Sequence, residues 1–296
     1  MEEHDGLTAR FEASRPRLRA IAYRMLGSLS DAEDAVQEAW IHAAGAGAGG
    51  VNNLEGWFTT IVARVCLTML RSRKSRREQL LDTEETTEAG PEQLAALADP
   101  EQEAVLADSV GLALLVVLDT LAPAERVAFV LHDTFGLPFG EIAAITGRSP
   151  AAARQLASRA RRRIQGTAPV SGVRLARQRE VADAFLAASR GGDLGALLAV
   201  LDPEVVLRAD AAAVPSGVPM TIRGAEAVAR GARAASVRSA YSGVALVNGT
   251  PGIVMAPHGR LVLVLAFTIP DGKISQIDVI ADPDRLEGLE LAVLDD

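Results

Sequence analysis

Phe139-Gly-Glu-Ile-Ala-Ala-Ile-Thr-Gly-Arg-Ser-Pro-Ala-Ala-Ala-Arg-Gln-Leu-Ala-Ser-Arg-Ala-Arg-Arg-Arg-Ile164 is the stretch from which the organisation of this chain can be inferred. Its first part places apolar residues at helical spacing, which predicts a short amphipathic helix. Gly147 can then adopt the positive φ that a tight turn between helices needs. Ser149 can cap a second helix, and Pro150 suits the first turn of that helix.

The second predicted helix has two distinct faces. One is an apolar stripe at helical spacing, made of Ala153, Leu156, Ala160 and Ile164. Two short helices joined in this way, with small Ala143 and Ala153 where they approach, form a helix-turn-helix pattern.

The other face of the second helix is basic. Six arginines and no acidic residue lie between Arg148 and Arg163, in a chain whose formal net charge is -8. A solvated basic face is the plain alternative, but local positive charge in an acidic chain favours a surface that faces phosphates. The predicted DNA-binding residues of this motif are Arg148, Ser149, Arg154, Gln155, Ser158, Arg159, Arg161 and Arg162.

The helix-turn-helix and its flanks resemble a known module. Leu121-Ala-Pro-Ala-Glu-Arg-Val-Ala-Phe-Val-Leu131, followed by the stretch quoted above, is similar to region four of extracytoplasmic-function sigma factors. The resemblance implies that residues 108–168 form an all-α module that recognises the upstream promoter element.

Composition sets limits on the class of protein. With 296 residues, of which 49% are hydrophobic, we expect several packed domains. One cysteine excludes an internal disulfide, and the scattered histidines predict no metal site and no cofactor. The acidic N-terminus does not resemble a signal peptide, and the longest apolar runs are too short to span a bilayer. We therefore expect a soluble cytoplasmic protein with no membrane contact.

An acidic helix is predicted near the N-terminus. Ser30-Asp-Ala-Glu33 reads as a capping box that opens it. Acidic residues near a helix start are also favoured by the helix dipole. The string Ser30-Asp-Ala-Glu-Asp-Ala-Val-Gln-Glu-Ala-Trp40 nevertheless resembles the sigma region-two helix that docks on core RNA polymerase. The resemblance implies polymerase contacts by Asp31, Asp34, Gln37 and Glu38.

A long helix over 54–70 is predicted to run into a basic segment. Six basic residues and no acidic one lie between Arg64 and Arg77, more than the dipole at a helix C-terminus would favour. The segment resembles the part of region two that captures the melted promoter strand, although Thr68 stands where an aspartate is usual. We expect residues 1–80 to form region two, with promoter contacts by Arg64, Arg71, Arg73, Lys74, Arg76 and Arg77.

An acidic segment separates the two predicted modules. Residues 78–108 carry ten acidic side chains and no basic one, and we assign 81–107 as a linker. The segment could mimic nucleic acid in a positive channel, or it could be a solubilising tether.

The composition changes after residue 172. Residues 173–296 predict helices broken at Gly191-Gly-Asp193, followed by an antiparallel sheet, which makes an α+β domain. Leu201-Asp-Pro-Glu-Val-Val-Leu-Arg208 and Asp282-Pro-Asp-Arg-Leu286 resemble the SnoaL-like domain, a cone or barrel, of SigJ-type sigma factors. The Asp-Gly-Gly-Gly-Lys signature usual in that family is replaced by Asp210-Ala-Ala-Ala-Val214, and the linker motif Trp-Leu-Pro-Glu-Pro is absent.

One strand of this domain, Leu261 to Ile269, is apolar on both faces. One face can pack on helices of its own domain, so the other must line a pocket or meet another protein surface. We expect an intramolecular contact with the sigma modules and regulation in cis, with any small ligand unknown.

Two other functions are compatible with parts of the sequence. A ligand-responsive helix-turn-helix regulator would explain the sensor-like domain but not residues 30–77. An enzyme is suggested by relatives of SnoaL that use acid–base groups, for which Asp210, His258 and Asp278 are the candidates. No pairing of an acid with a base is evident from their spacing, so we expect no catalytic residue.

Overall fold

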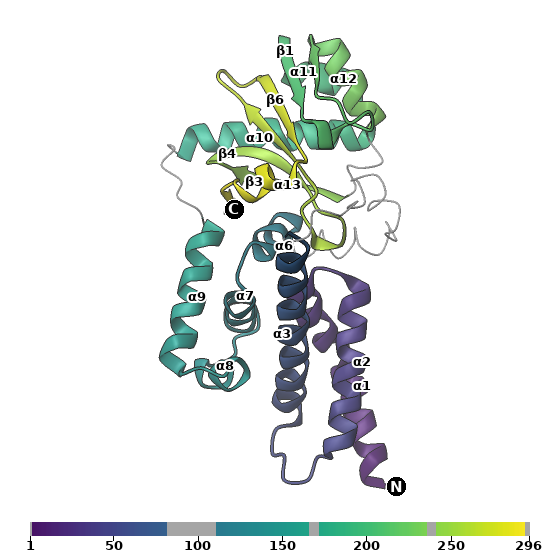
Figure 1. The fold of residues 1–296 in the computed structure, drawn as a ribbon, viewed down its shortest axis with the longest axis vertical. Coiled ribbons are helices and arrows are strands. Elements are labelled where there is room, and N and C mark those ends of the chain that lie inside the picture. The colour runs from purple at the N-terminus through teal and green to yellow at the C-terminus, as the bar shows by residue number, and fades with distance from the viewer. Residues whose placement is uncertain (1, 82–110, 166–171, 236–240, 294–296) are drawn as a thin grey trace. The chain divides into compact units, whose positions relative to one another are not determined.

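The computed structural model describes residues 2–81, 111–165, 172–235 and 241–293 (Figure 1). Residues 82–107 of the predicted acidic linker lie outside these ranges. The chain divides into two compact units. The first comprises residues 1–87 and 120–161, and the second comprises residues 88–119 and 162–296. Each unit is described by itself.

The first unit begins with three mutually packed helices, α1 (Glu2–Leu26), α2 (Leu29–Ala46) and α3 (Leu54–Leu81). Their shared core contains an aromatic cluster. The Phe11 ring lies 5.0 Å from the rings of both Trp40 and Phe58, measured between centroids. Alanines on α2 and larger aliphatic side chains of α1 and α3, such as Leu18, Ile21 and Val62, complete this core.

The start and end of α2 differ from the sequence prediction. The N-cap is Ser28, whose Oγ accepts a hydrogen bond from the Asp31 N–H at 3.4 Å, so the capping box predicted at Ser30 is wrong. Ser30 lies inside the first turn, where its side chain contacts Ser28 instead. The helix also continues through Ala46, although the alanine- and glycine-rich composition of residues 43–50 predicts a loop there, and it ends at Gly47 with φ 70°.

The rest of the first unit contains the helix-turn-helix. It comprises α7 (Pro123–Phe129), a π-helical turn (Val130–Thr134), α8 (Phe139–Thr146) and α9 (Pro150–Gln165), whose last turn belongs to the second unit. Gly147 has φ 69°, and Ser149 Oγ accepts a hydrogen bond from the Ala152 N–H at 3.2 Å. The predicted turn and cap are therefore confirmed.

The second unit is built on one mixed seven-stranded sheet in the order β2-β1-β6-β5-β4-β3-β7 (Figure 1). The strands are β1 (Leu201–Ala209), β2 (Met220–Arg223), β3 (Ser242–Val247), β4 (Thr250–Met255), β5 (Leu263–Thr268), β6 (Ile274–Ile280) and β7 (Leu291–Ala292). Short helical turns lie at Ala211–Ala213 (η2) and Pro257–Gly259 (η4). The helices are α6 (Leu112–Asp119), α10 (Gly172–Gly191), α11 (Leu194–Val200), α12 (Ala225–Ala234) and α13 (Pro283–Glu287).

The sheet departs from the predicted antiparallel sheet in one pairing, which is parallel, and in containing β2, β4 and β7, which were not expected from the sequence. β1 pairs with β6 in parallel, because the connection between them passes through a helix and four other strands. β4 was not predicted, since Pro251 and Gly252 are both uncommon inside strands. The structure explains the glycine: a Cβ at residue 252 would lie 2.5 Å from the Leu265 carbonyl oxygen of β5.

Helices α10, α11 and α12 cover one face of the sheet and close the main core. Phe185 of α10 meets Phe267 of β5 edge-to-face, with 5.3 Å between ring centroids. Ile269, Ile277 and Leu197 join the same cluster. This confirms that one face of the strand at 261–269 packs on helices of its own domain.

Candidate polymerase- and promoter-binding surfaces

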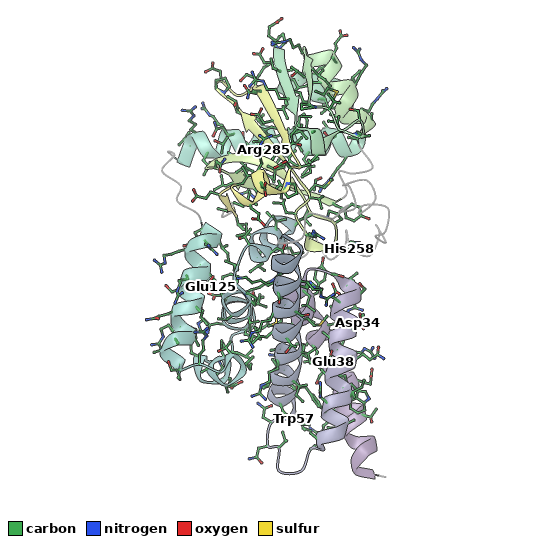
Figure 2. The ribbon with its side chains drawn as sticks, in the orientation of Figure 1. Asp34, Glu38, Trp57, Glu125, His258 and Arg285 are labelled. Carbon is green, nitrogen blue, oxygen red and sulfur yellow. The ribbon has the colours of Figure 1, made fainter. Side chains whose placement is uncertain are left out.

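The acidic surface of α2 is made of Asp34, Gln37 and Glu38, all of which are exposed. Asp34 and Glu38 lie four residues apart and therefore share one face of the helix (Figure 2). Glu38 lies 3.6 Å from His42 Nε2 one turn later. Apolar residues at 32, 35, 36 and 39 bury the opposite face, so the acidic groups are held on a rigid helix and face solvent.

Asp31 does not share that surface. It is half-buried and forms an ion pair with Arg73 of α3, and Arg73 Nη1 also donates to the Leu26 carbonyl at 3.1 Å. One residue predicted to bind polymerase is thus paired with one predicted to bind DNA. Together they tie the start of α2 to α3 and the end of α1.

The basic residues on α3 are otherwise exposed. Arg64, Arg71, Lys74 and Arg76 face solvent, and Arg76 Nη2 donates to Ser72 Oγ at 3.3 Å. The side chain of Arg77 lies outside the described residues. Arg64 is directed differently from the others, since its Nη2 donates to the Ala144 carbonyl of α8 at 3.2 Å.

The predicted recognition helix α9 keeps most of its polar face exposed, but three of its arginines are positioned by neighbours. The Arg154 guanidinium lies 5.3 Å from the centre of the Phe139 ring, in cation–π geometry. Arg161 Nε donates to Asp133 Oδ1 at 2.6 Å, and Arg159 lies 3.8 Å from Glu125. Residues exposed on this face are Arg148, Ser149, Arg154, Gln155, Ser158, Arg159 and Arg162.

The first three helices and the helix-turn-helix pack against each other within the first unit. α3 contacts α7 and α8, and the Arg24 guanidinium lies 5.2 Å from the centre of the Phe135 ring. Arg126 of α7 is only 1% exposed, and its charge acts on the buried thiol of Cys66 on α3. Burial raises the pKa of Cys66 to about 12, with Arg126 and Arg73 opposing the rise. The burial of Arg126 could not be predicted from the sequence, because a single arginine in an amphipathic helix is usually exposed.

The three acid–base candidates of the C-terminal domain, Asp210, Asp278 and His258, have different surroundings. The Asp210 carboxylate accepts hydrogen bonds from the backbone N–H groups of residues 213, 281 and 282, and Arg285 Nη1 donates to it at 3.1 Å. It clasps the end of β1 to the end of β6 and the start of α13. Asp278 accepts a bond from Gln276 Nε2 at 2.7 Å, and His258 lies in η4 with φ 53°. These hydrogen bonds give the Asp210 carboxylate a structural role.

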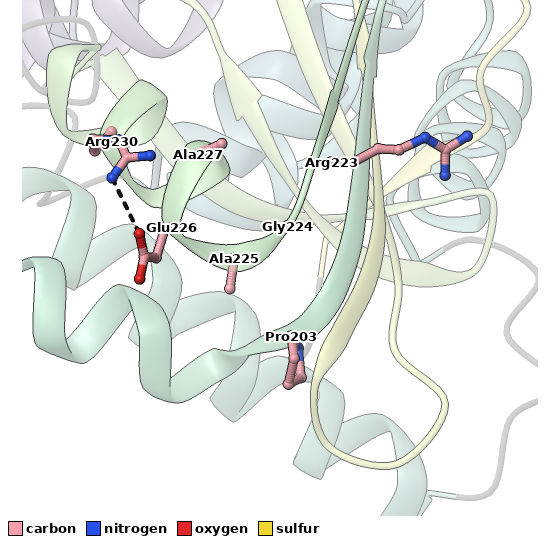
Figure 3. A pocket seen from close by; sticks show the side chains of 7 residues that line it. All are labelled: Pro203, Arg223, Gly224, Ala225, Glu226, Ala227 and Arg230. Carbon is pink, nitrogen blue, oxygen red and sulfur yellow. Dashed lines mark hydrogen bonds and ion pairs between the residues drawn. The ribbon is translucent and has the colours of Figure 1, made fainter.

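An open pocket of about 430 Å³ lies between β2 and α12 (Figure 3). Its charged side chains are Arg223, Glu226 and Arg230, and Glu226 forms an ion pair with Arg230 at 3.3 Å. Within the described ranges, no cluster of histidine, cysteine and acidic side chains could hold a metal ion. No helix there is long and apolar enough to cross a membrane.

Comparisons with known proteins agree on one family. Sigma-70 region 2 matches residues 10–76, and sigma-70 region 4 matches residues 111–164. The chain is 37% identical over 289 residues to a protein from Mycobacterium tuberculosis described as a probable ECF RNA polymerase sigma factor, SigI, covering 98% of each chain. It is 36% identical to the ECF RNA polymerase sigma factor SigJ of the same species, covering 95% of this chain and 93% of that one. The crystal structure of SigJ aligns over 95% of this chain and 98% of its own, with a TM-score of 0.45 and 32% identity.

Proposed function

The chain belongs to the extracytoplasmic-function sigma factors. From this premise we propose which of its surfaces bind polymerase and promoter DNA, and how its C-terminal domain regulates them. Sigma factors of this family bind core RNA polymerase and direct it to promoters. The match at residues 10–76 accounts for the part of the chain that a ligand-responsive regulator would leave unexplained. The chain therefore acts as a transcription initiation factor. We propose that it does so in the cytoplasm, where the polymerase is.

Polymerase docking is assigned to the exposed acidic face of α2. Asp34, Gln37 and Glu38 carry this role, because they are exposed on one rigid helix inside the segment that matches region 2. Asp31 contributes indirectly, since its ion pair with Arg73 ties the start of α2 to α3.

Promoter contacts are assigned to two basic surfaces. The end of α3, with Arg71, Lys74 and Arg76, is proposed to hold the melted promoter strand. On α9, Arg154 and Gln155 lie near the helix start, where recognition helices reach base edges, so we propose that they read the upstream element. Arg148, Arg159 and Arg162 are proposed to contact phosphates.

The C-terminal domain is proposed to regulate the sigma modules in cis. The observation that supports this is the apolar second face of its sheet. Val254 and Val264 lie on that face, opposite the helices α10 to α12, and both are fully buried. A free domain with this face exposed to water would be unstable, so the face is proposed to be covered by another part of the chain.

The proposed function is tested by run-off transcription with core polymerase and genomic DNA fragments. The purified chain should direct the polymerase to a small set of start sites and should co-elute with the core enzyme. Core polymerase alone is the control. Start sites that do not depend on the added chain, or failure to co-elute, would contradict the assignment.

A further inference from the structure

The π-helical turn at Val130–Thr134 precedes α8 and α9 and contacts them through two consecutive side chains. Turns of this kind are rare and occur frequently at functional sites. The chain folds back after the turn, since the Leu137 N–H donates to the Leu131 carbonyl at 2.9 Å. This fold places His132 against α8 and Asp133 against α9.

The His132 ring is held both by a hydrogen bond and by stacking. Its Nδ1 lies 2.9 Å from the Leu137 carbonyl oxygen. A carbonyl oxygen only accepts hydrogen bonds, so Nδ1 carries a proton and donates it to this bond. The imidazole stacks on the Phe139 ring at the start of α8, with 3.9 Å between ring centroids and 28° between ring planes. Both rings are half-buried, so the stack is partly shielded from solvent.

The Phe139 ring also contacts the predicted recognition helix. The Arg154 guanidinium of α9 lies 5.3 Å from the centre of this ring, within the range of cation–π attraction. Arg154 is exposed, and a long exposed side chain samples many rotamers in solution. A ring that is itself held in place by His132 restricts those rotamers before DNA binds. Less conformational entropy is then lost when the side chain is ordered in the complex.

The next residue of the π-helical turn contacts a different arginine. Asp133 Oδ1 accepts a charge-assisted hydrogen bond from Arg161 Nε at 2.6 Å. Arg161 follows Arg154 by close to two helical turns and therefore lies on the same side of α9. A DNA phosphate would have to compete with the Asp133 carboxylate for this guanidinium. Asp133 therefore lowers the positive charge that α9 offers to any duplex, whatever its sequence.

We propose that the π-helical turn sets the sequence specificity of α9. His132, acting through Phe139, positions Arg154 for base contact, which raises affinity for the correct sequence. Asp133 withholds Arg161 from DNA phosphates, which lowers affinity for all sequences alike. Together the two contacts increase the ratio of specific to non-specific affinity, the quantity that decides binding among many competing sites. The proposal rests on the proposed function in one respect, namely that α9 reads promoter DNA.

A double-substitution cycle tests the positioning role. Holoenzyme, reconstituted from the full chain and core polymerase, is titrated against a promoter duplex found by run-off transcription and against the same duplex with a scrambled upstream element. Phe139→Leu should lower the ratio of the two affinities about two- to fivefold, the contribution of a cation–π pair at an exposed site. In an Arg154→Ala chain it should leave the ratio unchanged, because the side chain that it positions is gone. Equal losses in both backgrounds would overturn the positioning role.

Substitutions of His132 separate the ring from the hydrogen bond. His132→Phe keeps an aromatic face against Phe139 and should retain most of the affinity ratio. His132→Asn can still donate to the Leu137 carbonyl but has no ring, so it should lower the ratio as Phe139→Leu does. A purely structural residue would instead, when replaced by asparagine, weaken binding to both duplexes alike, and that result would overturn the proposal.

Asp133→Asn tests the second contact, because it keeps the shape of the side chain and removes its charge. The released Arg161 should add about one phosphate contact, so affinity for the scrambled duplex rises and the salt dependence grows by about one counterion. Neither change should occur in an Arg161→Ala chain. Glu141→Gln, exposed on α8, makes the same change of charge elsewhere and should leave the salt dependence unaltered. If Asp133→Asn and Glu141→Gln behave alike, Asp133 does not withhold Arg161 and the proposal is wrong.

Failure of the proposed function would give a different result. A wild-type holoenzyme that binds the promoter and scrambled duplexes equally well would contradict promoter reading by α9. A wild-type holoenzyme that prefers the promoter duplex, with the same ratio in the Phe139→Leu and Asp133→Asn chains, would leave the proposed function standing. That second result would overturn only the role of the π-helical turn.

Discussion

Arg154 and Arg162 lie on the same helix but have different surroundings. Arg154 is held over the Phe139 ring, so its guanidinium is ordered before DNA arrives. Arg162 is exposed, in the last turn of α9. An ordered side chain near the helix start suits base reading, and an exposed one far from that start suits phosphate contact.

Arg154→Ala should therefore cost about 1–3 kcal/mol of binding to the upstream element and relax its sequence preference. Arg162→Ala should weaken binding to all sequences alike and reduce the salt dependence by about one counterion. Both are measured by fluorescence anisotropy on matched and scrambled duplexes over a salt series. Equal losses on both duplexes from both variants would contradict this division of roles.

Asp210 keeps the first residue of a family signature whose other positions differ in this chain, and its carboxylate accepts hydrogen bonds from four donors. Asp210→Ala should lower the free energy of unfolding by about 2–3 kcal/mol, because hydrogen bonds to a charged group are lost and backbone donors are left behind. Thermal unfolding of the full chain measures this. Asp271→Ala, in the exposed β5–β6 turn, is the control and should change stability little. A stable Asp210→Ala protein would mean that the clasp is dispensable.

Cys66 should also link stability to pH. Its folded-state pKa, about 12, exceeds the ordinary value of 9.0 because burial disfavours the thiolate. The stability associated with the neutral thiol is thus fully present below pH 9, and is lost as the pH rises towards 12 and the unfolded chain ionises first. The free energy of unfolding, measured by urea titration, should fall more steeply over this pH window in the wild type than in Cys66→Ala. Parallel pH curves would count against a buried neutral thiol.

At the scale of single elements, the acidic face of α2 is the proposed polymerase-docking surface. Asp34→Lys with Glu38→Lys should sharply weaken binding to core polymerase while thermal stability is unchanged, since both side chains face solvent. Co-elution and a titration against labelled core enzyme measure this. Glu180→Lys with Asp183→Lys, on exposed positions of α10, makes the same change of charge elsewhere and should bind normally. If both double variants bind equally well, the α2 assignment is wrong.

Elements with strong local signals were predictable from the sequence. Gly147, Ser149 and Pro150 each act on neighbouring backbone, and the helix-turn-helix they predict is confirmed. Elements set by distant contacts were not predictable. β4 exists because a glycine fits under the Leu265 carbonyl, and a pattern containing Pro251 reads as a loop. Among the site residues, exposure of Asp34 and Glu38 follows from helical spacing. The ion pair of Asp31 with Arg73 depends on how α2 packs on α3, and the spacing of residues along one helix does not specify that packing.

At the scale of the whole molecule, region four is divided between two compact units. α7, α8 and most of α9 group with region two, whereas α6 and the end of α9 group with the C-terminal domain. Truncation after Ser171 should therefore leave core binding through α2 intact and reduce transcription from the promoters that the full chain uses. Co-elution with core polymerase and run-off transcription, each compared with the full-length chain, provide the two measurements. If the truncated protein transcribes like the full chain at every concentration, the C-terminal domain has no role in promoter recognition and the proposal is wrong.

The contact of α6 with β3 and β7 also fixes an order of events during synthesis. A ribosome makes residues 112–119 long before it reaches residues 242–247, and residues 291–293 are made later still. Nascent chains fold from the N-terminus onward at the pace of translation, so region two can form while α6 still lacks its partner strands. The packing around α6 is then complete only after residues 291–293 have been made. A chain released before residue 242 would carry helix α2 but would lack the strands on which α6 packs.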